Sequence, residues 1–253
     1  MPFFSPVIAA NRSVGPQTIV TDQLVWMVDP KTTGNLNDLV GNINGTLVNG
    51  AYLDAENSLI TDGVNDYVEF GSQTATSPVG LYNLDNFTIC VWIHVLSVTD
   101  FPRVIAKGSS DGSQGWAVNT VNGFRLFTSL PITTYAPASY SLGAYTYYWQ
   151  YEDWAFVVFR ANKNDATNYP RDLRFTWLNA AEQSINSTTD GPATDNGTSI
   201  LVPNATGNLR IGGTTNGRYQ HMKFGAGMIY HKTLTDAEIL QNFNVMKSAY
   251  GIQ

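Results

Sequence analysis

The chain is poor in cysteine and in charge. A single cysteine among 253 residues, Cys90, excludes an intrachain disulfide, and its neighbours Ile89 and Val91 predict a sheltered thiol on a strand. Charged residues make up only 13% of the sequence, about half of the usual share, which is typical of a turn-rich β protein. The net charge of −6, without a cluster of lysines and arginines, argues against a nucleic-acid partner.

Long apolar runs and leader features are also missing. No segment approaches the ~20 consecutive apolar residues that a membrane-spanning helix requires, so we expect no membrane partner. The first residues have neither the basic start nor the long apolar core of a signal peptide, and Pro2 and Pro6 interrupt them. The sequence therefore predicts a soluble protein that is made in a cytoplasm.

Motifs of zinc and phosphate sites are absent as well. The three histidines, His94, His221 and His231, are far apart in the sequence and do not have the spacing of a helical zinc site. The chain contains no phosphate-binding Gly-x-x-x-x-Gly-Lys loop. We therefore expect a protein that is not an enzyme and has no cofactor, with structural calcium as the single candidate.

From Leu24 onward the sequence is a series of short β-rich runs bounded by Gly, Asn, Asp and Pro. Such runs, without helices between them, predict an all-β sandwich or barrel and exclude an alternating α/β fold. A chain of this length with 43% hydrophobic residues can form one such domain. Strands are expected at Leu24–Val28, Ser58–Ile60, Asp66–Phe70, Phe87–Val95, Val104–Lys107, Gly115–Thr120, Gly123–Thr128, Trp154–Ala161, Leu173–Leu178, Asn208–Gly212 and Met222–His231.

Two of these strands also predict which faces are buried. Residues 154–159 are apolar on both faces, as in a central strand. Residues 87–95 alternate, and the face that carries Trp92 and His94 is expected to border a groove or a second layer. The other face should lie in the core; it consists of Phe87, Ile89, Val91, Ile93 and Val95.

One helix is expected near the carboxyl end. Thr235 and Glu238 have the spacing of a capping box, in which each side chain satisfies a backbone donor at the helix start. Ile239 and Phe243 then begin an apolar stripe at helical spacing, so the helix should dock by this face and run to about Ala249.

The remaining segments are expected to be an arm and loops. Residues 1–22 have no usable periodicity and are predicted to form an extended amino-terminal arm, with residues 23–253 as the domain. The arm could lie on a neighbouring subunit or be a disordered tail, and the sequence leaves both open. Residues 131–149 and 179–203 are expected to be long loops, where function usually lies on a rigid sandwich.

Several segments, in this order, resemble one superfamily. They are LVWMVD (residues 24–29), NDLVGNINGTL (37–47), DGVNDYV (62–68), FTICVWI (87–93) and LTDAEILQNFN (234–244). Together they are similar to the concanavalin A-like lectins and glucanases, specifically the laminin-G-like branch, and the ending QNFNVMKSAYGI is similar to laminin-G-like proteins of tailed phages. The resemblance implies a jelly-roll β-sandwich with one short C-terminal helix.

The same resemblance raises the questions of hydrolysis and of calcium. Glucanases of this fold carry a Glu-x-Asp-x-x-Glu pattern or a similar one on a strand, and the chain lacks it. Many relatives bind calcium near the sandwich edge, and the available donors here are Asp38, Asp62 and Asp66. The strand before the last helix, residues 225–230, lacks the carboxylate that such relatives often carry. We therefore favour a turn that leads into a strand for residues 62–68.

One predicted loop and its border are rich in aromatic residues. Their rings could stack on sugars and bind a glycan, or they could form the core of a protein interface. We favour the interface slightly, because so many exposed rings without a partner would promote aggregation. The candidates are Tyr145, Tyr147, Tyr148, Trp149 and Tyr151.

These observations predict a non-enzymatic structural protein of a virion. We expect a phage head decoration or tail-associated surface protein with a lectin-like fold, assembled in the host cytoplasm. Its expected partners are other capsid or tail proteins, further copies of the same chain, and a host glycan. A bacterial carbohydrate-binding module or cell-surface lectin is the first alternative, and a glycan-active hydrolase is the second.

Overall fold

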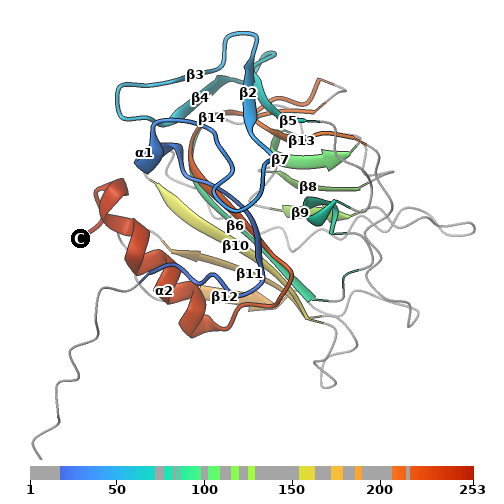
Figure 1. Ribbon diagram of the computed structural model, residues 1–253, viewed down its shortest axis with the longest axis vertical. Coiled ribbons are helices and arrows are strands. Elements are labelled where there is room, and N and C mark those ends of the chain that lie inside the picture. Colours follow the sequence, from blue (N-terminus) through green and yellow to red (C-terminus); the bar gives the residue numbers. More distant parts are fainter. Residues whose placement is uncertain are drawn as a thin grey trace, which may run out of the picture.

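The computed structural model describes residues 18–71, 77–81, 84, 86–97, 102–108, 115–119, 125–128, 154–162, 172–178, 186–189, 207–214 and 217–253. Within these residues the chain forms two antiparallel sheets and a carboxyl-terminal helix, arranged in layers (Figure 1). The predicted β-sandwich with one C-terminal helix is confirmed.

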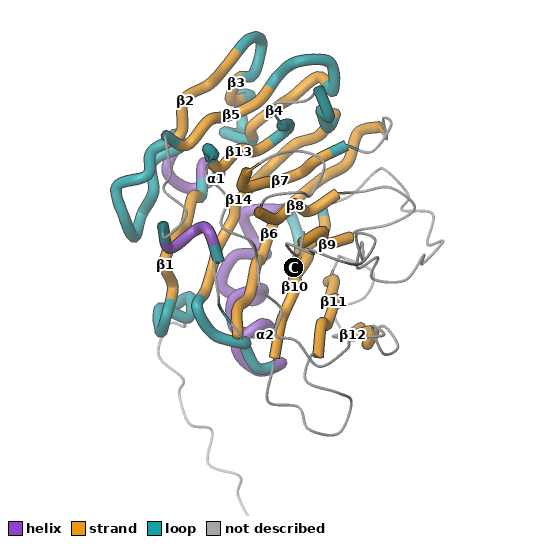
Figure 2. The backbone as a smooth tube through the Cα atoms, turned by 90° about the vertical axis from the view of Figure 1, so that its right-hand side faces the viewer, coloured by secondary structure: helices purple, strands orange, loops and turns teal. Residues whose placement is uncertain are grey.

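The larger sheet has eight strands in the described part of the chain. Seven follow the order β12-β11-β10-β6-β14-β4-β3, and β1 pairs with β14. Figure 2 shows β1, β14, β6, β10, β11 and β12 running side by side across this sheet. The strands are β1 (Leu24–Val28), β3 (Tyr52–Leu53), β4 (Leu59–Asp62), β6 (Asn86–Ser97), β10 (Ala155–Asn162), β11 (Asp172–Leu178), β12 (Asn186–Thr189) and β14 (His221–Tyr230).

The smaller sheet has six described strands in the order β2-β5-β13-β7-β8-β9. They are β2 (Gly45–Val48), β5 (Tyr67–Phe70), β7 (Arg103–Gly108), β8 (Gly115–Asn119), β9 (Arg125–Thr128) and β13 (Leu209–Ile211). The described helical segments are α1 (Pro30–Thr33), the 3₁₀ turn η1 (Pro78–Gly80), α2 (Asp236–Met246) and the 3₁₀ turn η2 (Lys247–Tyr250). Among the described residues, no helix has both the length and the apolar content to cross a membrane.

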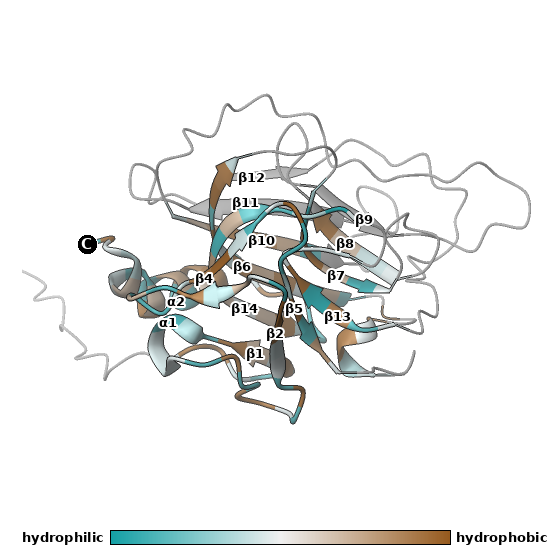
Figure 3. Ribbon diagram, turned by 90° about the horizontal axis from the view of Figure 1, so that it is seen from above, coloured by the Kyte–Doolittle hydropathy of each residue, from teal (hydrophilic) through white to brown (hydrophobic). Residues whose placement is uncertain are grey.

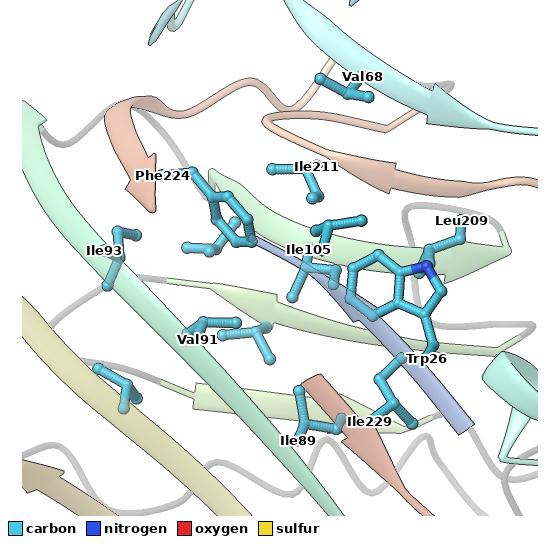
Figure 4. Close-up of a cluster of buried hydrophobic side chains, with 14 of the residues drawn as sticks. Trp26, Val68, Ile89, Val91, Ile93, Ile105, Leu209, Ile211, Phe224 and Ile229 are labelled. Atoms are coloured by element: carbon cyan, nitrogen blue, oxygen red, sulfur yellow. The ribbon is translucent and has the colours of Figure 1, made fainter. Parts of the chain in front are cut away.

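The main core lies between the two sheets. Figure 4 shows side chains of β6, such as Val91 and Ile93, facing Ile105 of β7 and Ile211 of β13 across this space. Trp26 of β1 and Trp116 of β8 contribute the largest buried side chains of this core. All five residues predicted for the apolar face of residues 87–95 belong to this core, which confirms the predicted alternation.

Helix α2 forms a further layer on the outer face of the eight-stranded sheet (Figure 3). Trp92 of β6 points to this layer, and its ring stacks on Phe243 at 5.5 Å and on Tyr250 at 4.0 Å between centroids. The predicted second layer is therefore confirmed. Cys90 is buried on the same face, and burial raises the pKa of its thiol. Residues 154–159 supply side chains to both cores, as expected of a central strand.

The start of α2 has the predicted capping box. The Glu238 backbone N–H donates to Thr235 Oγ1 at 3.3 Å, and the Thr235 N–H donates to the Glu238 carboxylate at 2.8 Å. The α-helix ends at Met246, and η2 continues it as a tighter turn before Gly251 adopts a left-handed φ of +75°.

The described residues of the predicted arm lie on the domain itself. The Val20 N–H donates to Asn242 Oδ1 of α2 at 2.8 Å, and the Tyr230 hydroxyl donates to the Val20 carbonyl at 3.0 Å. Val20 is buried in the cluster beneath α2. Residues 1–17 lie outside the described residues, so the proposed role of the arm stays a prediction.

The structure also contains elements that the sequence did not predict. Strand β12 lies within residues 179–203, so the prediction of a continuous loop there is wrong. Among the described strands it pairs only with β11, as an edge strand whose formation depends on that partner. β2 and β3 are also short edge strands, and β2 exposes 43% of Leu47. α1 is a single turn, capped by Asp29 and begun by Pro30, and this signal is present in the sequence.

Candidate functional site

Two of the three aspartates proposed as calcium donors meet in one turn. Asp62 Oδ1 accepts from the backbone N–H groups of the next residues, at 2.8 Å from Val64 and 3.2 Å from Asn65. Asp66 accepts from the Gly50 N–H at 2.7 Å and from the Asp62 N–H at 3.2 Å. Partial burial alone would raise the pKa of the Asp62 carboxyl group. The hydrogen bonds from the backbone N–H groups have the larger combined effect, so the pKa is lowered overall. These contacts fit a turn that leads into β5.

Asp38 serves a separate loop. Its Oδ1 accepts from the N–H groups of Met27 at 3.2 Å and Val40 at 3.0 Å, and its Oδ2 accepts from the Ile43 N–H at 3.3 Å. A calcium ion requires six to eight oxygen ligands, whereas these carboxylate oxygens are directed at N–H donors. In the part of the chain that the structure describes, no three His, Cys, Asp or Glu side chains gather as a metal site. The aromatic candidates Tyr145, Tyr147, Tyr148, Trp149 and Tyr151 lie outside the described residues.

The outer face of the six-stranded sheet carries a different group of polar and aromatic side chains. On β5 the core residues Val68 and Phe70 alternate with Tyr67 and Glu69, which therefore face outward. On β13 Arg210 lies between two core residues and pairs in register with Glu69. The sheet thus places a tyrosine, a carboxylate and a guanidinium on one outer surface.

These three side chains contact one another directly. Arg210 Nε donates to Glu69 Oε1 at 2.8 Å, and the Arg210 guanidinium lies 4.5 Å from the centre of the Tyr67 ring. Partial burial raises the pKa of Glu69, but hydrogen bonds from Asn208 and Arg210 and the arginine charge lower it overall. Glu69 is therefore a stable anion that fixes Arg210 against Tyr67.

The connection from β13 of the smaller sheet to β14 of the larger sheet adds a second tyrosine. The Tyr219 ring is roughly parallel to that of Tyr67, at 25°, with 6.4 Å between centroids. A Cβ placed on Gly213 would lie 2.3 Å from Tyr219 Cδ1, so the ring rests directly on the glycine backbone. Both tyrosines remain partly exposed. This connection holds Tyr219 in place through its own main chain at Gly213.

Two further arginines belong to this part of the molecule. The Gly212 N–H donates to the Val104 carbonyl at 2.9 Å and so fastens the connection to the start of β7, where Arg103 lies. A register shift between Arg103 and Ile105 lets Arg103 leave the core-facing row. Burial and then the charge of Arg218 lower the pKa of Arg103 to about 10. Arg103 is 4% exposed, whereas Arg218 is half-buried.

We call this group the tyrosine–arginine cluster; it consists of Tyr67, Glu69, Arg103, Arg210, Arg218 and Tyr219. Partly exposed rings beside guanidinium donors can bind the apolar face and the hydroxyl groups of a sugar at once. The sequence analysis assigned Tyr67 only to the start of a strand and did not identify the other members. Strand registers bring them together from three distant segments, and the local signal was limited to Arg218-Tyr219 in a glycine-rich connection.

No protein-family model matches the chain, and no curated protein matches it in sequence. Solved structures match it in fold. Domain 4 of AbnA, a GH43 extracellular arabinanase from Geobacillus stearothermophilus, in complex with arabinotriose, has a TM-score of 0.53 and 11% identity, covering 87% of this chain and 98% of that one. The binding domain of botulinum neurotoxin DC in complex with SialylT has a TM-score of 0.57 and 14% identity, covering 90% and 52%.

A mutant of Trypanosoma rangeli sialidase that displays trans-sialidase activity is also similar, with a TM-score of 0.56 and 14% identity, covering 93% of this chain. The chain spans 35% of that enzyme and about half of the toxin structure. At these identities the likeness establishes the fold alone. It agrees with the expected concanavalin A-like sandwich. The link to tailed-phage proteins receives no support from these structures and stays a prediction.

Proposed function

We propose that this chain is a carbohydrate-binding β-sandwich domain that binds a glycan at the tyrosine–arginine cluster and does not turn it over. The observation that carries the proposal is the pair of partly exposed tyrosine rings, one of which is fixed on a glycine backbone. A sugar ring presents C–H groups on one face and hydroxyl groups around its edge. Fixed rings and adjacent guanidinium groups bind both without ordering a loop first.

Binding without hydrolysis is supported by the state of Glu69. A glycoside hydrolase needs two carboxyl groups across the scissile bond, one of them protonated at working pH. Glu69 is held as an anion by Arg210, and its lowered pKa is the opposite of what a general acid requires. The fold shared with domain 4 of the arabinanase and with the toxin binding domain is compatible with a binding role.

The proposal is tested by glycan-array binding followed by calorimetry on the best ligand. Tyr219→Ala should lower the affinity at least tenfold, because it removes the ring that rests on Gly213. Tyr52→Ala is the matched control, since Tyr52 is a 53% exposed tyrosine on the other sheet. Equal loss in both variants, or unchanged binding by Tyr219→Ala, would contradict the assignment of the site.

A narrower proposal places the domain on the surface of a tailed-phage particle. It is supported by the similarity of residues 241–252 to phage laminin-G-like proteins and by the expected amino-terminal arm. Because Val20 is part of the core beneath α2, the deletion that tests the arm should end at residue 17. The shortened chain should fold and fail to enter particles; normal incorporation would exclude the arm as the docking element.

A further inference from the structure

The first described residues of the chain are bound by side chains of α2 and β14. Residues 18–22 cross α2 and lead toward β1, and we call them the strap (Figure 1). Val20 anchors the strap, because its side chain is 8% exposed and packs in the cluster beneath α2 that also contains Tyr230 and Phe243. We call the side chains that hydrogen-bond to the strap the strap site; they are Tyr230, Lys232, Gln241 and Asn242.

The centre of the strap site binds the main chain of the strap. The Val20 N–H donates to Asn242 Oδ1 at 2.8 Å, and the Val20 carbonyl accepts from the Tyr230 hydroxyl at 3.0 Å. Asn242 Nδ2 donates to the Tyr230 hydroxyl at 3.0 Å and closes a ring of three hydrogen bonds. Both side chains are fully buried, and a buried polar group that loses its partner costs free energy. The strap site is therefore stable only when an extended segment occupies it.

Two outer contacts specify which segment fits. Gln241 Nε2 donates to the Thr18 carbonyl at 2.7 Å at one end of the strap, and Lys232 Nζ pairs with Asp22 Oδ2 at 2.9 Å at the other end. A segment with a buried apolar residue and an aspartate two residues later satisfies these contacts in one direction only. The strap of a second copy of this chain has this pattern by definition.

The turn that joins the strap to β1 is strained. The Leu24 N–H donates to the Thr21 carbonyl at 3.2 Å and closes a four-residue turn whose third residue is Gln23. Gln23 has a φ of +57°, a left-handed conformation that favours glycine or asparagine at this position. Extending the turn removes this strain and carries the strap away from its own strap site. Short strained connections of this kind favour the exchange of an identical segment between two copies.

We propose that the strap is exchanged between two copies of this chain, so that each strap occupies the strap site of the other copy. Each copy then supplies Val20 to the buried cluster of its partner. The contacts of the strap are the same in the closed and the exchanged forms, so the balance between them depends on the turn at Gln23 and on protein concentration. Reciprocal exchange gives a closed dimer with two-fold symmetry. The tyrosine–arginine cluster takes no part in it, and the proposal does not depend on glycan binding.

The experiment uses two full-length variants that each carry one added cysteine, Thr18→Cys on the strap and Gln241→Cys in the strap site. Both positions are accessible, and the native residues are in contact. The two proteins are mixed and treated with a short bis-maleimide. A covalent heterodimer should form, with a yield that rises with total protein concentration. In the matched control, Gln241→Cys is replaced by Tyr52→Cys, which is 53% exposed on β3, and no heterodimer should form above background.

Variants of the turn test the cause of the exchange. Gln23→Gly in both proteins should lower the heterodimer yield roughly fivefold or more, because glycine adopts the positive φ without steric cost and the closed form gains. Gln23→Pro should raise the yield, since proline fixes φ at about −65° and excludes the closed turn. Circular dichroism and the melting temperature confirm that each variant is folded.

Three outcomes would overturn the proposal. The first is the absence of heterodimer at every concentration with the wild-type turn. The second is an equal yield with the Tyr52→Cys control, which would indicate random collision. The third is a yield that Gln23→Gly leaves unchanged, because exchange through the turn requires a response to its strain. These comparisons decide the question even where Gln23→Pro fails to fold.

Discussion

Replacing Gly213 by alanine should destabilise the domain through one side chain, Tyr219. The new Cβ would lie 2.3 Å from Cδ1 and 2.8 Å from Cε1 of the ring, whereas carbon atoms in contact are about 3.5–4.0 Å apart. The ring must therefore retreat by about 1 Å, and a forced shift of this size costs about 1–3 kcal/mol. Gly213 lacks the left-handed φ of its neighbour Gly212, so the alanine adds no backbone strain of that kind.

A double-mutant cycle separates this collision from any general intolerance of alanine. Urea unfolding is measured for the wild type, Gly213→Ala, Tyr219→Ala and the double variant. With the ring removed, Gly213→Ala should be neutral or should stabilise the fold by up to about 1 kcal/mol, because alanine restricts the unfolded chain. The difference between these two effects, which is the interaction energy, is then about 1–4 kcal/mol. Additive effects would show that the ring does not rest on Gly213. Gly213→Ala should also lower the affinity for glycan, since the displaced Tyr219 ring no longer aligns with that of Tyr67.

Three further predictions concern single polar groups. Lys107 faces the interior of the sandwich and donates to the Gly207 carbonyl at 2.6 Å, and burial lowers its pKa to about 8. The Lys107 ammonium group binds its proton more tightly in the unfolded chain than in the folded one. The free energy of unfolding of the wild type should therefore rise by about 2 kcal/mol between pH 7 and 9.5, relative to that of Lys107→Met. Parallel curves of unfolding free energy against pH for the two proteins would disprove this. Asp66→Ala should cost about 1–3 kcal/mol, because it leaves the Gly50 and Asp62 N–H groups without their acceptor. Calcium should not change the wild-type melting temperature, and a calcium-dependent rise that Asp66→Ala abolishes would indicate a metal site instead. Thr235→Ala should cost about 1 kcal/mol in thermal unfolding, and Thr235→Ser should recover most of it; equal losses would exclude the cap.

The sequence predicted best those strands and helices whose own residue pattern shows which of their faces are buried. β6 alternates because one face meets the other sheet and the opposite face meets α2, so both the strand and its layers could be inferred. The start of α2 was predictable because a capping box is a local device. By contrast β2, β3 and β12 exist through pairing with a neighbour, and their short sequences carry little signal of their own.

The candidate site escaped prediction for a related reason. The sequence draws attention to crowded residues, such as Asp62 and Asp66, and these side chains serve a turn. The members of the tyrosine–arginine cluster come from residues 67–69, 103 and 210–219. They meet only because β5 and β7 pair with β13 on either side and because the connection after β13 is fastened to β7. Strand order across a sheet depends on contacts between distant segments, and it cannot be inferred from the local pattern of a single sequence.

The position of Cys90 provides an internal reporter of how the layers separate. Its thiol lies beneath α2, on the same face of β6 as Trp92, and it is the chain's single cysteine. A thiol reagent can therefore modify the native protein only when the helix lifts from the sheet. The modification rate, divided by that of the unfolded chain, gives the equilibrium constant for this opening directly. Bound glycan should leave that rate unchanged if the cluster on the far sheet is independent of the helix, and should slow it if ligand binding tightens the whole sandwich.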